Sequence, residues 1–189
     1  MRKSLPSAAV FPFLFAAAFS GVPAASAAFD AAPTLLSQED AEQSRKRAAK
    51  EDWSEVFADG LFKADGEEVP VSALRKKKYV GVYVSASWCG PCRAFTPELV
   101  ELYKEYEREL EIVLIGADRS QDEVFKYARD HGMPWLVAKQ GSAANGYMTR
   151  HGVRGIPDFR LFDKNGKLLE ADGRNLKAVR AILDGKKRR

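Results

Sequence analysis

Apolar residues gather into two short continuous runs in the middle of the chain, and each run predicts a buried β-strand. Residues 79–84 read YVGVYV, and residues 111–116 read EIVLIG. Uninterrupted runs of this kind are typical of central strands that are covered on both faces. A third segment, DFRLF at residues 158–162, alternates polar and apolar residues and predicts a half-buried strand.

Turn residues predict two hairpins. Asp65-Gly66 is a turn pair, and residues 61–63 and 68–71 on either side of it are expected to pair as short strands. The tight turn DKNG at residues 163–166 follows the half-buried strand, so residues 167–171 are expected to return as its partner.

Apolar residues recur at intervals of three and four in three other segments, which predicts amphipathic helices over residues 91–109, 120–130 and 175–183. Pro97 falls inside the first and is expected to kink it. Residues 141–146 are expected to form a loop, and residues 144–151 a short helix. Strands alternating with helices, followed by a hairpin, predict an α/β fold with a central mixed β-sheet flanked by helices on both faces.

The first 27 residues predict a signal peptide. Arg2 and Lys3 precede an apolar run at residues 8–19, and Ala25-Ser26-Ala27 fits a small-residue cleavage site. The apolar run is shorter than the ~20 residues that span a bilayer. We therefore expect export, with the periplasm of a Gram-negative bacterium as the destination; the alternative is a protein tethered to the membrane by an uncleaved leader.

The rest of the chain predicts one domain between two polar segments. Residues 28–52 form an N-terminal extension that is partly helical from Ser37 onward, and residues 186–189 form a basic tail. Residues 53–185 are numerous enough to enclose a single core. A monomer is the default expectation, because such a fold buries its sheet without a partner.

The charge of the chain is too mild to indicate nucleic-acid binding. The formal net charge is +4, and removal of Arg2 and Lys3 with the leader lowers it to +2. Basic runs alternate with acidic stretches, which is typical of a solvated surface. Contact of the KKRR tail with an acidic partner or a membrane surface stays open.

The chain has two cysteines, Cys89 and Cys92, both within the stretch SASWCGPCRAF. A structural disulfide across two intervening residues would constrain almost none of the unfolded chain. Zinc usually takes four protein ligands, but the only histidines are His131 and His151, without the spacing of a zinc site. Haem attachment requires histidine directly after the second cysteine, where this chain has Arg93. No metal site is expected.

Redox chemistry fits the position of the cysteines better. A predicted strand leads through a turn to a helix that starts at the cysteines, and Pro91 suits its first turn. Unpaired N–H groups and the helix dipole would favour the thiolate of Cys89, which makes it the attacking sulfur. Cys92, one turn later, could attack the resulting mixed disulfide and release the partner.

The motif Trp88-Cys89-Gly90-Pro91-Cys92 after a strand resembles the active site of the thioredoxin family. Pro97 stands where that family kinks its active-site helix, and Ile156-Pro157 precedes a strand as the family's cis-proline does. The blocks SASWCGPCRAFTPELVELY, EIVLIGAD and MPW resemble the tryparedoxin and nucleoredoxin branch more narrowly. The resemblance covers residues 53–185.

The resemblance implies a thioredoxin-like fold and a thiol–disulfide oxidoreductase that acts on protein disulfides or dithiols. It implies no cofactor beyond the redox-active disulfide Cys89–Cys92, and an electron donor or acceptor that the sequence does not identify. A cis peptide at Pro157 would turn the backbone of Ile156 towards bound substrate; a trans turn is the alternative. Gly90-Pro91 favours the reductive direction, because thioredoxin has a reduction potential of about −270 mV, against about −120 mV for a strong periplasmic oxidant.

Two departures from the family leave questions open. Tyr83 stands where many thioredoxins have a buried aspartate that helps move the proton of the second thiol, so water, Glu98 or Asp158 could take that role. The tryparedoxin branch usually has WCPPC, whereas Gly90 gives the thioredoxin dipeptide, and the residues between the cysteines influence the redox potential.

The roles of the neighbouring residues and of the protein as a whole have alternatives. Trp88 either shields the sulfurs and contacts partners or is a core residue. Trp135 is expected in the core or at its rim. Arg93 either stabilises the thiolate or docks a partner, or it is a solvated charge on the helix. A binding module that docks clients without redox chemistry and a metallochaperone are the competing functions; a peroxidase fits less well, because both thiols are already used.

Overall fold

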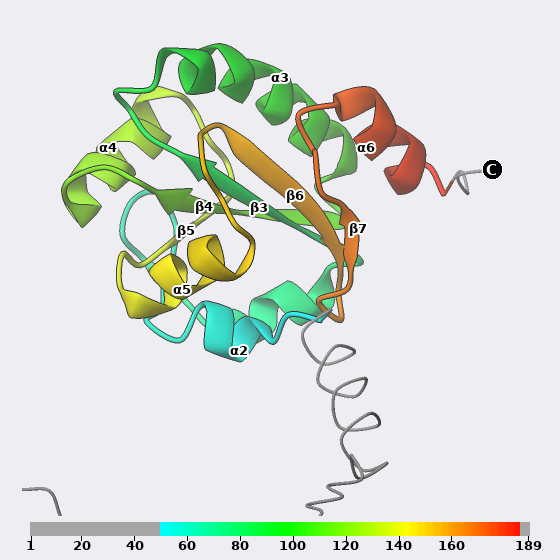
Figure 1. Cartoon of the computed structure of the whole chain (residues 1–189), viewed down its shortest axis with the longest axis horizontal. Coiled ribbons are helices and arrows are strands. Elements are labelled where there is room, and N and C mark those ends of the chain that lie inside the picture. The colour runs from blue at the N-terminus through cyan, green and yellow to red at the C-terminus, as the bar shows by residue number, and fades with distance from the viewer. Residues whose placement is uncertain (1–49, 186–189) are drawn as a thin grey trace, which may run out of the picture. The chain divides into compact units, whose positions relative to one another are not determined.

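The computed structural model describes residues 50–185 (Figure 1). The expected signal peptide (1–27), most of the N-terminal extension (28–49) and the basic tail (186–189) lie outside the described residues and stay predictions. No helix within residues 50–185 is long and apolar enough to cross a membrane.

A seven-stranded mixed sheet forms the centre of the domain, in the order β2-β1-β5-β4-β3-β6-β7. Its three central strands β5, β4 and β3 are parallel, and β1 and β6 join them on either side as antiparallel strands. The strands are β1 Leu61–Phe62, β2 Glu68–Val69, β3 Tyr79–Ser85, β4 Leu110–Gly116, β5 Leu136–Ala138, β6 Asp158–Asp163 and β7 Leu168–Glu170. The two predicted hairpins are present as β1–β2 and β6–β7.

Helices cover both faces of this sheet, as predicted (Figure 1). One apolar cluster joins α3, α4 and α6 to one face, and the other joins α2, the 3₁₀ helix η1 and α5 to the opposite face. Alternate residues of β3 supply both clusters, since Tyr79 and Tyr83 lie in the first and Val80, Val82 and Val84 in the second. The helices are α2 Trp53–Val56, η1 Val71–Lys76, α3 Gly90–Tyr106, α4 Gln121–Asp130, α5 Ser142–Arg150 and α6 Leu176–Leu183.

Strand β3 is the element that places the cysteines, and all seven of its residues are buried. It pairs with β4 along its whole length and with β6 on its other side. Gly81 leaves room for the ring of Phe159 from β6, because a Cβ at this position would lie 2.6 Å from that ring. The carboxyl end of β3 is therefore held on both sides.

The expectation of a loop over residues 141–146 is wrong, because α5 is helical from Ser142. Gly141 provides no side-chain cap for this helix. Instead, the carboxylate of Asp59 accepts a hydrogen bond from the backbone N of Ala143 at 3.0 Å. The sequence around residue 141 carries no start signal, since the capping group comes from a distant segment. The short elements β5, α2 and η1 were also not predicted.

The described chain begins with an anchored segment at Lys50 and Glu51. The backbone N of Glu51 donates to the carbonyl O of Gly166 at 2.8 Å. The Glu51 carboxylate, with a side chain only 8% exposed, accepts from Arg150 Nη2 and pairs with His151 Nε2, both at 2.9 Å. This carboxylate ties the segment to the end of α5.

Replacing Glu51 by glutamine is expected to lower the free energy of unfolding by about 1–3 kcal/mol at neutral pH, because it removes charge-assisted hydrogen bonds. Burial raises the pKa of Glu51, but hydrogen bonds from His151 and Arg150 outweigh it and hold that pKa below 4.5. The contribution is therefore present above pH 4.5 and is lost as the pH falls through the lowered pKa.

Urea unfolding of the wild type and Glu51→Gln at pH 7 and at acid pH measures this difference. Glu68→Gln on exposed β2 is the matched control and should change little. A difference between wild type and Glu51→Gln that stayed constant down to the lowest pH would contradict the assignment.

Candidate active site

The two cysteines lie where β3 leads into α3, at the carboxyl end of the central parallel strands. Cys89 is the N-cap residue of α3, and its Sγ accepts a hydrogen bond from the backbone N of Cys92 at 3.2 Å. Pro91 occupies the first turn, where an N–H would have no partner within the helix. A backbone N–H of the first helical turn is therefore directed at the first sulfur, as predicted.

Cys89 and Cys92 are joined by a disulfide, with their Cα atoms 5.2 Å apart. Cys89 is 6% exposed and Cys92 is fully buried. Cys89 is therefore the more accessible of the two, and its role as the attacking sulfur stays a prediction. Trp88 beside them is 65% exposed, which excludes the alternative that it is a core residue; Trp135, at 2%, does lie in the core.

The peptide bond between Ile156 and Pro157 is cis, as the resemblance implied. The carbonyl O of Ile156 lies 3.7 Å from Cys89 Sγ, and Ile156 packs against the buried cluster of Ala86, Cys89 and Cys92. Segments 67 residues apart thus meet at the disulfide. All seven predicted site residues, Trp88, Cys89, Gly90, Pro91, Cys92, Ile156 and Pro157, belong to these two segments.

A cluster of buried hydroxyl groups lies under the first turn of α3. Tyr83 Oη donates to the carbonyl O of Cys92 at 3.2 Å, and Thr96 Oγ1 donates to the same oxygen at 2.9 Å. Ser85 Oγ donates to Tyr83 Oη at 3.1 Å and lies 3.0 Å from Tyr127 Oη. These contacts fix the backbone that carries Cys92.

Sequence reasoning found only Tyr83 of this hydroxyl cluster. Ser85 and Thr96 carried a usable signal, since Ser85 lies two residues after Tyr83 on the same face of a strand and Thr96 one helical turn after Cys92. Tyr127 joins the cluster only through the packing of α4 on the sheet, which the local sequence does not indicate.

Tyr83 does not replace the missing aspartate as a proton acceptor. Burial raises the pKa of Tyr83 to about 12, so its hydroxyl stays protonated at neutral pH and acts as a donor. Glu98 is exposed, and Asp158 is occupied by an ion pair with Arg160 at 2.9 Å. Among the described residues, neither carboxylate hydrogen-bonds to a cysteine, so neither is assigned the role.

Replacing Tyr83 by phenylalanine is expected to lower the free energy of unfolding by about 1–3 kcal/mol, because buried hydrogen-bonding groups lose a partner while the packing is kept. Tyr106→Phe is the matched control, since its hydroxyl bonds to Asp184 at the surface and should contribute within about 0.5 kcal/mol. Denaturant unfolding of the oxidised proteins measures both; equal losses would contradict a structural role for the cluster.

Asp118 is a further site residue that the sequence did not single out. Its side chain is buried, and Oδ1 accepts from the backbone N of Ser87 at 3.0 Å and from Ser87 Oγ at 2.6 Å. These bonds hold the turn that carries Trp88 beside the disulfide. Within residues 50–185, no three His, Cys, Asp or Glu side chains converge as a metal site would require.

Residues 77–168 match the protein family described as "Thioredoxin-like". Among curated proteins, probable nucleoredoxin 1 of Arabidopsis thaliana is 40% identical over 119 residues, and nucleoredoxin of Bos taurus is 38% identical over 127 residues. These matches cover 61% and 65% of this chain, but only 20% and 28% of the two relatives. The chain thus spans less than a third of the length of either relative.

Solved structures match over most of their own length. Thioredoxin from Wuchereria bancrofti is 34% identical with a TM-score of 0.58, and the match covers 68% of this chain and 87% of that one. Tryparedoxin from Trypanosoma brucei is 32% identical with a TM-score of 0.55, covering 67% and 86%. With the fold and the cysteine site, these similarities show that the chain belongs to the thioredoxin-like family, in its nucleoredoxin and tryparedoxin branch.

Proposed function

We propose that this protein is a thiol–disulfide oxidoreductase that exchanges the Cys89–Cys92 dithiol and disulfide with protein partners. The observation that carries the proposal is the asymmetry of the pair. Cys89, at the helix N-terminus, keeps a small exposed fraction of 6%, whereas Cys92, one turn along the same helix, is fully buried. A pure binding module has no need of this arrangement.

In the reductive direction, the thiolate of Cys89 attacks one sulfur of the partner disulfide. The partner's S–S bond breaks, a mixed disulfide with Cys89 forms, and the partner's second sulfur leaves as a thiolate. The backbone N of Cys92, which lies 3.2 Å from Cys89 Sγ, stabilises the attacking thiolate.

Cys92 then completes the exchange. Its thiol loses a proton to solvent, and the resulting thiolate attacks Cys89 Sγ, breaks the mixed disulfide and restores the Cys89–Cys92 bond. The partner receives two electrons and leaves as a dithiol. The hydroxyl cluster keeps the Cys92 backbone in place during both steps, while the Ile156 carbonyl beside Cys89 offers a hydrogen-bond acceptor to the partner's main chain.

The direction and the compartment belong to the same proposal. Gly90-Pro91 favours reduction of partner disulfides, and the leader in residues 1–27 favours export to a periplasm. In that oxidising compartment a separate donor must return electrons to Cys89 and Cys92. Export is tested by isolating the protein from the periplasm and measuring its mass. A protein found only in the cytoplasm, with its leader intact, would contradict export.

Reduction of insulin by dithiothreitol, followed with catalytic amounts of the protein, tests the activity. We expect acceleration over dithiothreitol alone, and none with the Cys89→Ser, Cys92→Ser double variant. A wild-type protein that gives no acceleration would contradict the proposed function. A double variant that still captured clients would instead favour the binding module.

A further inference from the structure

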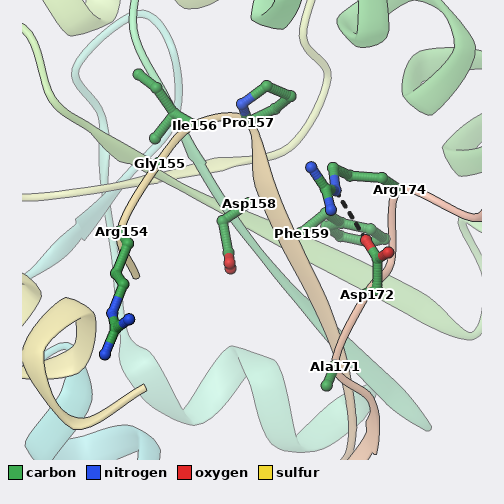
Figure 2. Close-up of a pocket in the computed structure, with 9 residues that line it drawn as sticks. All are labelled: Arg154, Gly155, Ile156, Pro157, Asp158, Phe159, Ala171, Asp172 and Arg174. Atoms are coloured by element: carbon green, nitrogen blue, oxygen red, sulfur yellow. Dashed lines mark hydrogen bonds and ion pairs between the residues drawn. The ribbon is translucent and has the colours of Figure 1, made fainter. Parts of the chain in front are cut away.

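A hollow of about 370 Å³ lies beside the cis-Pro157 loop, within the usual size range of ligand pockets (Figure 2). Two segments form it, residues 154–159 and the loop 171–174 that connects β7 to α6. Ile156 belongs both to this hollow and to the redox site, since its carbonyl O lies 3.7 Å from Cys89 Sγ. A partner joined to Cys89 and running along the loop would therefore reach the hollow.

The two carboxylates of the hollow are already neutralised. Asp158 accepts from Arg160 through both oxygens, at 2.9 Å from Nε and 3.2 Å from Nη2. Asp172 accepts from Arg174 Nε at 2.8 Å, the contact drawn as a dashed line in Figure 2. Neither aspartate is therefore free to balance a further positive charge.

Arg154 carries the charge that is not balanced. Its side chain is exposed and makes no hydrogen bond or ion pair with any of residues 50–185. In Figure 2 it lies on one side of Asp158, with Arg174 on the other. The ion pair of Arg174 uses Nε, so its terminal nitrogens keep donors for a ligand. The hollow thus offers guanidinium donors at both ends.

Two further exposed arginines belong to segments next to the cysteines. Arg93 is exposed on the first turn of α3. The exposed Arg119 lines a second hollow with Trp88 and Glu123. Arg93 adds a positive charge next to Cys92, whereas the carboxylate of Glu123 offsets Arg119 in the second hollow.

We propose that the hollow receives a carboxylate close to the reacting cysteine of the partner, and that Arg154 binds this carboxylate. This inference rests on the proposed function and names its substrate class as disulfides flanked by acidic groups. Because Arg154 precedes Ile156 by two residues, a segment extended along the loop places its carboxylate two or three positions from its cysteine. Such a carboxylate comes either from Asp or Glu in a protein or from a small acidic peptide such as glutathione.

Exchange kinetics with matched disulfide peptides test the proposal. Three peptides carry Glu, Gln or Lys two and three positions from one cysteine and are otherwise identical, and hydroxyethyl disulfide is the neutral reference. For the full-length wild type we expect kcat/KM about three- to fivefold higher for Glu than for Gln, as for one exposed ion pair, and lowest for Lys. The preference should shrink as salt is added.

Arg154→Glu is expected to reverse the order of the three peptides and to leave hydroxyethyl disulfide unchanged. Arg108→Glu makes the same change of charge beyond the far end of α3, about 25 Å from the cysteines, and should keep the wild-type order. Glutathione disulfide distinguishes the two sources. A parallel loss for it in Arg154→Glu assigns a small acidic thiol, and an unchanged rate assigns a protein segment.

The inference fails if the wild type treats the three peptides alike, or if Arg154→Glu changes their rates, together with that of hydroxyethyl disulfide, by one common factor. A preference of the wild type for the Lys peptide would show that the carboxylates of Asp158 and Asp172 determine the charge preference of the hollow. This result would also overturn the inference. These outcomes differ from failure of the proposed function, in which no disulfide would be exchanged at all.

Discussion

Cys89→Ser is expected to abolish exchange with protein disulfides, lowering kcat/KM on the order of a thousandfold or more. A serine hydroxyl is not ionised at neutral pH and cannot form a disulfide with the partner. Cys92 cannot take over the attack, because it is fully buried within the first turn of α3. The insulin assay measures the loss.

The fold is expected to survive this change, so the loss reports chemistry. Serine is a preferred N-cap residue and can accept the bond from the Cys92 backbone N that the sulfur now accepts. The lost disulfide closes a loop of only a few residues and constrains little of the unfolded chain. Near-native rates in a folded Cys89→Ser protein would assign the attack to Cys92 and contradict the division of roles.

Cys92→Ser is expected to convert the protein into a trap for its partners. The first attack proceeds through Cys89, but no second sulfur remains to break the mixed disulfide. Covalent complexes should therefore accumulate towards one partner per protein, while catalytic turnover falls by orders of magnitude.

Mass spectrometry without reductant measures these complexes, and dithiothreitol should release them. The Cys89→Ser, Cys92→Ser double variant is the control and should form none. A Cys92→Ser protein that turned over normally would show that resolution comes from a partner thiol. One that formed no complex would contradict attack by Cys89.

The sequence predicts the elements whose signals are local. YVGVYV and EIVLIG are uninterrupted apolar runs, and they form β3 and β4, both almost entirely buried. The start of α4 was equally predictable, since Ser120 is the N-cap residue and its side chain accepts a hydrogen bond from the backbone N of Glu123. The cysteine motif at a strand–helix junction predicted the chemistry of the site for the same reason.

Features that depend on distant residues were not predictable from local patterns. Helix α5 is capped by Asp59, which lies 84 residues away from the bonded amide. Tyr127 joins the hydroxyl cluster from α4, and Asp118 reaches Ser87 across 31 residues. Strand β5 has only three residues, too few to show a period. In each case the missing information was a tertiary contact.

The reduction potential of the Cys89–Cys92 pair is the measurement that tests the central claim most directly. The protein is equilibrated in graded dithiothreitol and glutathione buffers, trapped by alkylation, and the oxidised fraction is determined. We predict one reversible two-electron couple near or below about −240 mV, as expected for a reductase supplied by a dedicated donor. A couple above about −180 mV would contradict the reductive direction, and the absence of any reversible couple would contradict the oxidoreductase itself.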